Sequence, residues 1–152
     1  MQPLPLQFAL PVGALEAVAG VLPYVILVVV LANLVTRILA QRNYARQAEE
    51  EDVDDDAPLS RYLPHEIMNV VLVLLTFAMT IVQPHGGLVL ATLVVGLFIS
   101  DFFEFEARCV EVRNGMEIER PNSAIFASGL VVLYAGFQAL FFLIEPYWGQ
   151  VI

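Results

Sequence analysis

The chain has 152 residues, of which 59% are hydrophobic, so it is too apolar for an ordinary soluble domain and too short for more than one domain. Its 16 acidic residues outnumber 7 basic ones, all arginine, which gives a net charge of −9. This balance excludes a general affinity for nucleic acid or for anionic lipid. We therefore predict one membrane domain over residues 1–152, with an all-α fold.

The surplus of acids in a chain without lysine indicates a haloarchaeal protein. Molar salt shortens the Debye length to about 3 Å, so closely spaced carboxylates tolerate one another there.

At the N-terminus, residues 4–35 form an apolar stretch that is too long for one membrane crossing and too short for two. Pro11 and Pro23 are the expected breakpoints, because proline lacks an amide donor and disfavours helix at the residue before it. We expect residues 11–20 to form a short interfacial helix at the outer surface. The alternative is that residues 4–20 form a re-entrant segment buried against the bundle.

Four segments are long and apolar enough to cross a hydrocarbon core about 30 Å thick, which requires about 20 helical residues. They are residues 21–39, 65–82, 87–103 and 123–144. The arginines fall into two stretches, Arg37 to Arg61 and Arg108 to Arg120. Because positive charge favours the cytoplasmic side, we place segments 40–64 and 104–122 in the cytoplasm and both termini outside, in a multi-pass protein of the cell membrane. The predicted fold is thus a four-transmembrane-helix bundle with a short N-terminal interfacial helix.

The first cytoplasmic segment begins without a helix breaker, so we expect the first helix to continue through residues 41–51, supported by Arg46 and Glu50 at i,i+4. Residues 49–56 contain seven carboxylates among eight positions. This run lacks the glycine turn and the final glutamate of a calcium-binding loop, so we interpret it as a hydrated loop.

Spans two and three are joined by the breaker-rich turn of residues 83–87, which predicts an antiparallel hairpin. After span three, Asn114-Gly115 fits two structures. It is either the turn of a β-hairpin between residues 109–113 and 116–120, or the left-handed stop of a helix that continues through Arg113. We favour the helix, because Glu104 and Arg108 form an i,i+4 pair.

Polar side chains inside the spans are expensive and require partners. Asn69, Thr76 and Thr80 share one helical face. We expect such residues to hydrogen-bond between helices, with Thr80 bonded to Gln138 at the same height, and a polar pathway is the alternative. The candidate intramembrane contacts are Asn33, Asn69, Thr76, Thr80 and Gln138.

Span three also carries Thr92, Gly96 and Ser100 at i,i+4 spacing. Such a small-residue face allows another helix to approach closely.

Ionisable residues concentrate where span two begins and span three ends, which the hairpin brings together. The candidate cluster comprises His65, Glu66, Asp101, Glu104 and Arg108. One interpretation is a set of ion pairs that anchors the helix ends, with Arg37, Arg61 and Arg108 facing Glu66, Asp101 and Glu104. The alternatives are a proton relay or a transition-metal site, because a histidine with several carboxylates suits both.

Common catalytic signatures are missing from the sequence: a P-loop, a G-x-G-x-x-G fingerprint, an H-E-x-x-H pair and a G-x-S-x-G elbow. The two histidines, His65 and His85, are expected on opposite sides of the membrane, which excludes bis-histidine haem ligation within one chain. We therefore expect no enzyme activity, no cofactor and no metal.

The segments LQFALPVGALEAVAGVLPYVILVVVLAN, SRYLPHEIMNV and SDFFEFEARCVEVR resemble a family of small haloarchaeal integral membrane proteins of unknown function. The resemblance covers nearly the whole chain, and it implies a family and a habitat but no activity. The expected role is a small structural or accessory membrane protein, a subunit or assembly partner of a larger complex. Its expected partners are the lipid bilayer and either another membrane protein or further copies of itself. A small oligomeric transporter or channel is the alternative.

Overall fold

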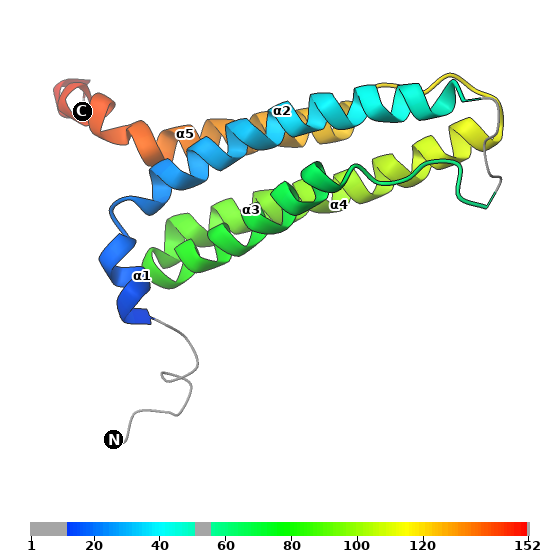
Figure 1. The fold of residues 1–152 in the computed structure, drawn as a ribbon. Helices are drawn as coiled ribbons and strands as arrows, with labels where there is room; N and C mark the ends of the chain where they lie inside the picture. The colour runs from blue at the N-terminus through cyan, green and yellow to red at the C-terminus, as the bar shows by residue number, and fades with distance from the viewer. Residues whose placement is uncertain (1–11, 51–55, 152) are drawn as a thin grey trace.

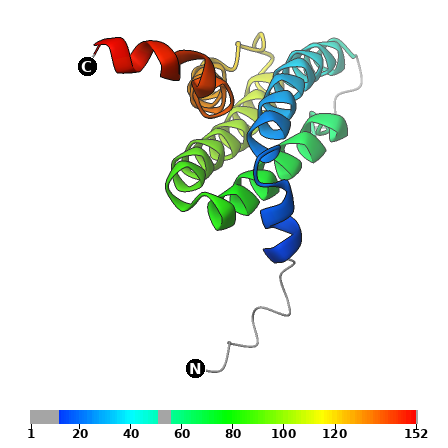
Figure 2. The same ribbon diagram turned by 90° about the vertical axis from the view of Figure 1, so that its left-hand side faces the viewer.

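A computed structural model describes residues 12–50 and 56–151, and helices joined by turns and loops make up this part of the chain, with no strand. Five helices follow one another: α1 (Val12–Val18), α2 (Leu22–Ala48), α3 (Leu63–Val82), α4 (Pro84–Arg113) and α5 (Asn122–Val151). The four long helices lie side by side as a bundle (Figures 1 and 2). Each long helix packs mainly against two other long helices: α2 and α4 each contact both α3 and α5. The middle of the predicted acidic run, residues 51–55, lies outside the described residues, as do residues 1–11 with Pro11.

Helices α2 to α5 are each long and apolar enough to cross a membrane, which confirms the all-helical prediction with four membrane-length helices. Three of them, α2, α3 and α4, begin with a proline in the first turn, where the missing amide donor costs nothing. Three of the predicted spans lie within one of these helices, and the first, residues 21–39, begins one residue before α2; α2 and α4 continue well past residues 39 and 103.

The end of α4 decides between the two structures that fit Asn114-Gly115. Helix α4 continues through Arg113, and Gly115 stops it with φ of 67°. The amides of Gly115 and Met116 bond the carbonyls of Val112 and Glu111, which is the Schellman pattern for a helix end. The helix prediction is therefore confirmed, and the β-hairpin is wrong.

Helix α2 is shorter than predicted, because it ends at Ala48 with Glu49 as its C-cap. Glu50 lies beyond the helix, so the expected helical pair of Arg46 and Glu50 is wrong.

Helix α1 lies across one end of the bundle, where it contacts α3 (Figure 1). The side chains of residues 13–20 are exposed or half-buried. This part of the N-terminal segment is therefore not buried within the bundle as a re-entrant segment would be, and its position at a membrane interface stays a prediction.

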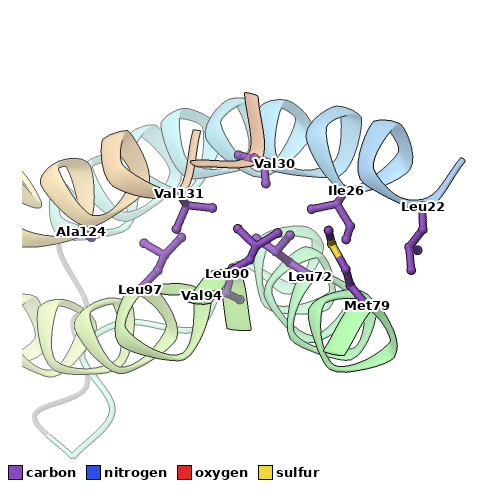
Figure 3. Packing of buried hydrophobic residues seen from close by; sticks show 11 residues of the cluster. Leu22, Ile26, Val30, Leu72, Met79, Leu90, Val94, Leu97, Ala124 and Val131 are labelled. Carbon is purple, nitrogen blue, oxygen red and sulfur yellow. The ribbon is translucent and has the colours of Figure 1, made fainter. Parts of the chain in front are cut away.

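An apolar core fills the inside of the bundle, from Leu22 at the start of α2 to Ala124 at the start of α5 (Figure 3). Ile26 of α2, Met79 of α3 and Val131 of α5 have no exposed surface at all. The turn between α3 and α4 is tight, because a Cβ added at Gly87 would lie 2.4 Å from the backbone nitrogen of Thr80. Only glycine permits this approach of the two helices.

The last part of α5 leaves the bundle. Every described side chain from Phe142 to Val151 is exposed, and Pro146 lies within this stretch of helix. Figure 2 shows the C-terminal end of α5 running away from the other helices. These residues therefore contribute an apolar arm rather than a part of the core.

Candidate functional site: a polar cluster at the arginine end

The arginine end is the end of the bundle at which α2 and α4 end and α3 and α5 begin. Asp101 of α4 lies at the centre of the polar side chains there. Both terminal guanidinium nitrogens of Arg37 on α2 bond its carboxylate, and Nη2 lies 2.9 Å from Oδ2. The same Oδ2 accepts from Asn69 Nδ2 at 3.1 Å and lies 3.3 Å from His65 Nε2. One carboxylate therefore joins three helices.

Two asparagines extend these contacts deeper into the bundle. Asn33 Nδ2 donates to Asn69 Oδ1 at 2.7 Å, and Asn33 Oδ1 accepts from Arg37 Nη2 at 3.2 Å. The Thr36 hydroxyl lies 2.9 Å from His65 Nδ1. We call these six residues the polar cluster: Asn33, Thr36, Arg37, His65, Asn69 and Asp101.

Helical spacing produces this arrangement. Asn33 and Arg37 are i,i+4 on α2, as are His65 and Asn69 on α3, so each pair presents two polar groups on one face. Arg37, His65 and Asn69 are all buried, at 4–6% exposed, and Asn33 is 2% exposed. Buried ionisable and amide groups require partners, and these groups provide them for one another.

A second pair of charges lies one turn closer to the end of α4. Arg108 Nη2 lies 3.6 Å from Glu104 Oε2, and Arg108 Nε donates to Gln41 Oε1 on α2 at 2.9 Å. Glu104 also accepts from the amide of Ser123 at 3.1 Å and from its hydroxyl. This pair therefore connects α2 and α4 with the start of α5.

Arg61, in the segment before α3, forms an outer layer over these contacts. It lies 3.3 Å from carboxylate oxygens of Glu66 and of Glu106. Its guanidinium carbon lies 4.1 Å from the ring centroid of Phe105, a cation–π distance.

A small cavity of about 30 Å³ lies among these groups. Its lining residues include all five members of the predicted cluster: His65, Glu66, Asp101, Glu104 and Arg108. A cavity of this size has room for a water molecule. Arg37 also lines it, and the buried Nε of Arg37 has no hydrogen-bond partner within the described residues.

The structure pairs the predicted charges as an anchoring network would: Arg37 with Asp101, Arg61 with Glu66, and Arg108 with Glu104. Among the described residues, no group of three or more histidine, cysteine, aspartate or glutamate side chains is arranged to hold a metal ion.

Of the predicted intramembrane contacts, Asn33 and Asn69 hydrogen-bond between helices. Thr76 and Thr80 instead donate to carbonyls of their own helix, those of Val73 and Thr76. The predicted bond between Thr80 and Gln138 is wrong.

Gln138 bonds Tyr134 within α5 at 3.1 Å. Its side chain lies against Gly86 of α4, where an added Cβ would be 2.5 Å from Gln138 Nε2. The height of Gln138 along the bundle thus matches the turn between α3 and α4, but the helix that it contacts is α4.

Sequence reasoning missed Thr36, Gln41 and Tyr44, which all lie on α2. Tyr44 is buried, and its hydroxyl accepts from the amide of Tyr62 at 3.1 Å. The signal was present as a polar face on the second half of α2, where Asn33, Arg37, Gln41 and Tyr44 follow one another at spacings of four, four and three.

A protein-family model described as "Domain of unknown function (DUF7313)" matches residues 2–152. No curated protein and no solved structure matches the chain.

Proposed function

The chain belongs to the family described as a domain of unknown function (DUF7313). This family assigns no role, so we propose one from the geometry of the structure. We propose that the protein is a small accessory subunit of a larger membrane complex. It packs against a transmembrane helix of a different protein through one face of α4. The bundle itself is held together by the polar cluster.

The observation that supports this proposal is the position of the small-residue face of α4. Thr92 and Gly96 are exposed and Ser100 is half-buried, so this face points away from the bundle. A Cβ added at Gly96 would meet no atom within 4 Å. In a bilayer, small residues at i,i+4 let two helix backbones approach closely, which favours association. The Thr92 hydroxyl already donates to the carbonyl of Leu88 at 2.8 Å, so it places no polar demand on a partner.

The polar cluster is suited to holding the helices of the bundle together. Asp101 contacts side chains from α2 and α3, and these contacts occupy both of its oxygens. Interhelical hydrogen bonds and ion pairs of this kind fix the relative rotation of packed helices.

The alternative, a small oligomeric transporter or channel, requires a polar route. From the polar cluster to α1, most buried side chains of the described bundle are apolar, among them Val30, Leu72 and Met79, each at most 2% exposed. The buried hydroxyls of Thr76 and Ser128 donate to carbonyls of their own helices, so they do not form a continuous polar lining. A route would therefore have to run between several copies of the chain.

We place the arginine end in the cytoplasm and both termini outside, in the cell membrane, because the arginines of α2, α4 and their loops lie there. We also propose a haloarchaeal, high-salt habitat, which the surplus of carboxylates favours. A protein more stable at about 0.1 M than at about 3 M salt would contradict the habitat.

The test of the accessory role is purification of the tagged chain from the membranes of its own host in a mild detergent. The variant Gly96→Leu fills the small-residue face. Gly129→Leu is the matched control, because Gly129 is also an exposed helical glycine with no atom within 4 Å of an added Cβ, but it lies on α5.

We expect the wild type and Gly129→Leu to purify with the same partner in fixed proportion, and Gly96→Leu to purify without it. A lone monomer would overturn the accessory role. A complex containing only copies of this chain would favour the oligomeric alternative.

A further inference from the structure

A groove at the arginine end, between α2 and the start of α5, gathers positive charge in an otherwise acidic protein. It has a volume of about 450 Å³. Its lining residues are Arg37, Ile38, Gln41, Arg42, Arg120, Pro121 and Ile125. Three of the seven arginines of the chain thus lie around one groove, and no carboxylate lines it.

The segment between α4 and α5 builds one wall of the groove. The carbonyl of Glu119 accepts from Gln41 Nε2 on α2 and from Arg108 Nη2 on α4, both at 3.4 Å. These contacts hold the segment over α2. They bring Arg120, remote in sequence, to the same groove as Arg42.

Two of these arginines, Arg42 and Arg120, lie at the rim of the groove. Neither the Arg42 side chain nor the Arg120 side chain has a hydrogen bond or an ion pair within the described residues, and both residues are exposed. Arg37, at the floor, is 6% exposed and already paired with Asp101, so the uncompensated positive charge of the groove comes from Arg42 and Arg120. Guanidinium groups in such a setting suit a phosphate, because their planar N–H donors match its oxygens.

The remaining walls are apolar and face outward. Ile38 and Ile125 are 56% and 50% exposed and lie on the two helices that flank the groove. Ile38 belongs to the apolar, membrane-length part of α2, and Arg42 follows one turn later. The groove therefore has a charged half beyond the apolar segment and an apolar half beside it, which matches the headgroup and the upper acyl chain of a lipid.

We propose that this groove binds an anionic phospholipid, with the phosphate between Arg42 and Arg120 and the upper acyl chain against Ile38 and Ile125. Free inorganic phosphate shares the headgroup chemistry but not the apolar contacts. The site is local, so it is compatible with a net charge that opposes general binding to anionic membranes. It requires only that the helices lie in a bilayer, and it does not depend on the accessory role.

The experiment is native mass spectrometry of the purified chain, equilibrated in detergent with equal amounts of phosphatidylglycerol and phosphatidylcholine of the same acyl chains. The variants are Arg42→Gln and Arg120→Gln. The matched control is Arg46→Gln, which removes the same charge from α2 one turn farther along, outside the groove. Protection of the buried thiol of Cys109 checks that each variant is folded.

We expect the wild type and Arg46→Gln to retain phosphatidylglycerol in preference to phosphatidylcholine. Each groove variant should weaken that retention about five-fold, the factor that corresponds to one arginine near an anionic surface. Equal retention of the two lipids by the wild type, or an equal loss in Arg46→Gln, would overturn the proposal. Displacement of the lipid by millimolar inorganic phosphate would overturn the lipid proposal and show that the groove binds a free anion.

Discussion

The ion pair between Arg37 and Asp101 gives the sharpest test of the bundle, because its two members are almost completely buried. Their side chains are 7% and 14% exposed. Removing one partner of such a pair leaves an uncompensated charge, which costs about 3–5 kcal/mol. We therefore expect Asp101→Asn and Arg37→Gln each to lower the free energy of unfolding by about that amount.

The double variant should behave differently, because no unpaired charge remains when both side chains are amides. We expect it to lose no more stability than either single variant, so that the two losses are far from additive. The pair of Arg61 and Glu66 provides a control, since its side chains are 32% and 27% exposed. Its coupling energy should be below about 1 kcal/mol.

The assay can use the only cysteine of the chain. Cys109 is 8% exposed, so a thiol-reactive fluorophore reports its exposure on unfolding. Titration with a denaturing detergent in mixed micelles then gives the free energy of unfolding of each variant. Additive losses for Arg37→Gln and Asp101→Asn, within about 0.5 kcal/mol, would show that the two side chains do not form a coupled buried ion pair.

Three further predictions use the same assay. Asn69→Ala removes two interhelical hydrogen bonds and should lower the free energy of unfolding by about 1–2 kcal/mol. The hydroxyl of Thr80 bonds only its own helix, so Thr80→Val should change that free energy by less than about 0.5 kcal/mol. Equal losses in the two variants would contradict this expectation. Gly87→Ala should lower the free energy of unfolding by about 1–3 kcal/mol, because its Cβ would overlap the backbone of Thr80. Gly96→Ala, whose Cβ meets no neighbour, should not destabilise the isolated chain. The reverse order would show that the tight turn is misassigned. Gly115→Ala should cost about 1 kcal/mol at its positive φ and Gly115→Asn less, since asparagine tolerates that conformation; equal stability of both with the wild type would argue against the left-handed helix end.

The sequence predicted the elements of this fold because each has a local cause. Hydropathy marks the four membrane-length helices, and the pair of Glu104 and Arg108 together with Gly115 marks the extended end of α4. The hairpin of α3 and α4 also predicted that His65 and Asp101 lie close together, since the start of one helix faces the end of the other.

The errors concern the rotation and the end of helices, which local patterns do not fix. Thr80 and Gln138 were matched by height alone, yet packing turns Gln138 toward Gly86 of α4. The polar face of α2 that carries Thr36 and Gln41 was missed, because its partners come from three other parts of the chain. The departure of α5 from the bundle after Ala139 likewise depends on tertiary contacts, and its sequence remains as apolar as the packed part.

The most direct test of the accessory role is a photo-crosslinking residue placed at position 96 of α4 and activated in the membranes of the native host. We expect one discrete adduct with a different membrane protein, and a much weaker one from the same residue placed at position 129 of α5. Crosslinks to lipid alone from position 96 would contradict this expectation.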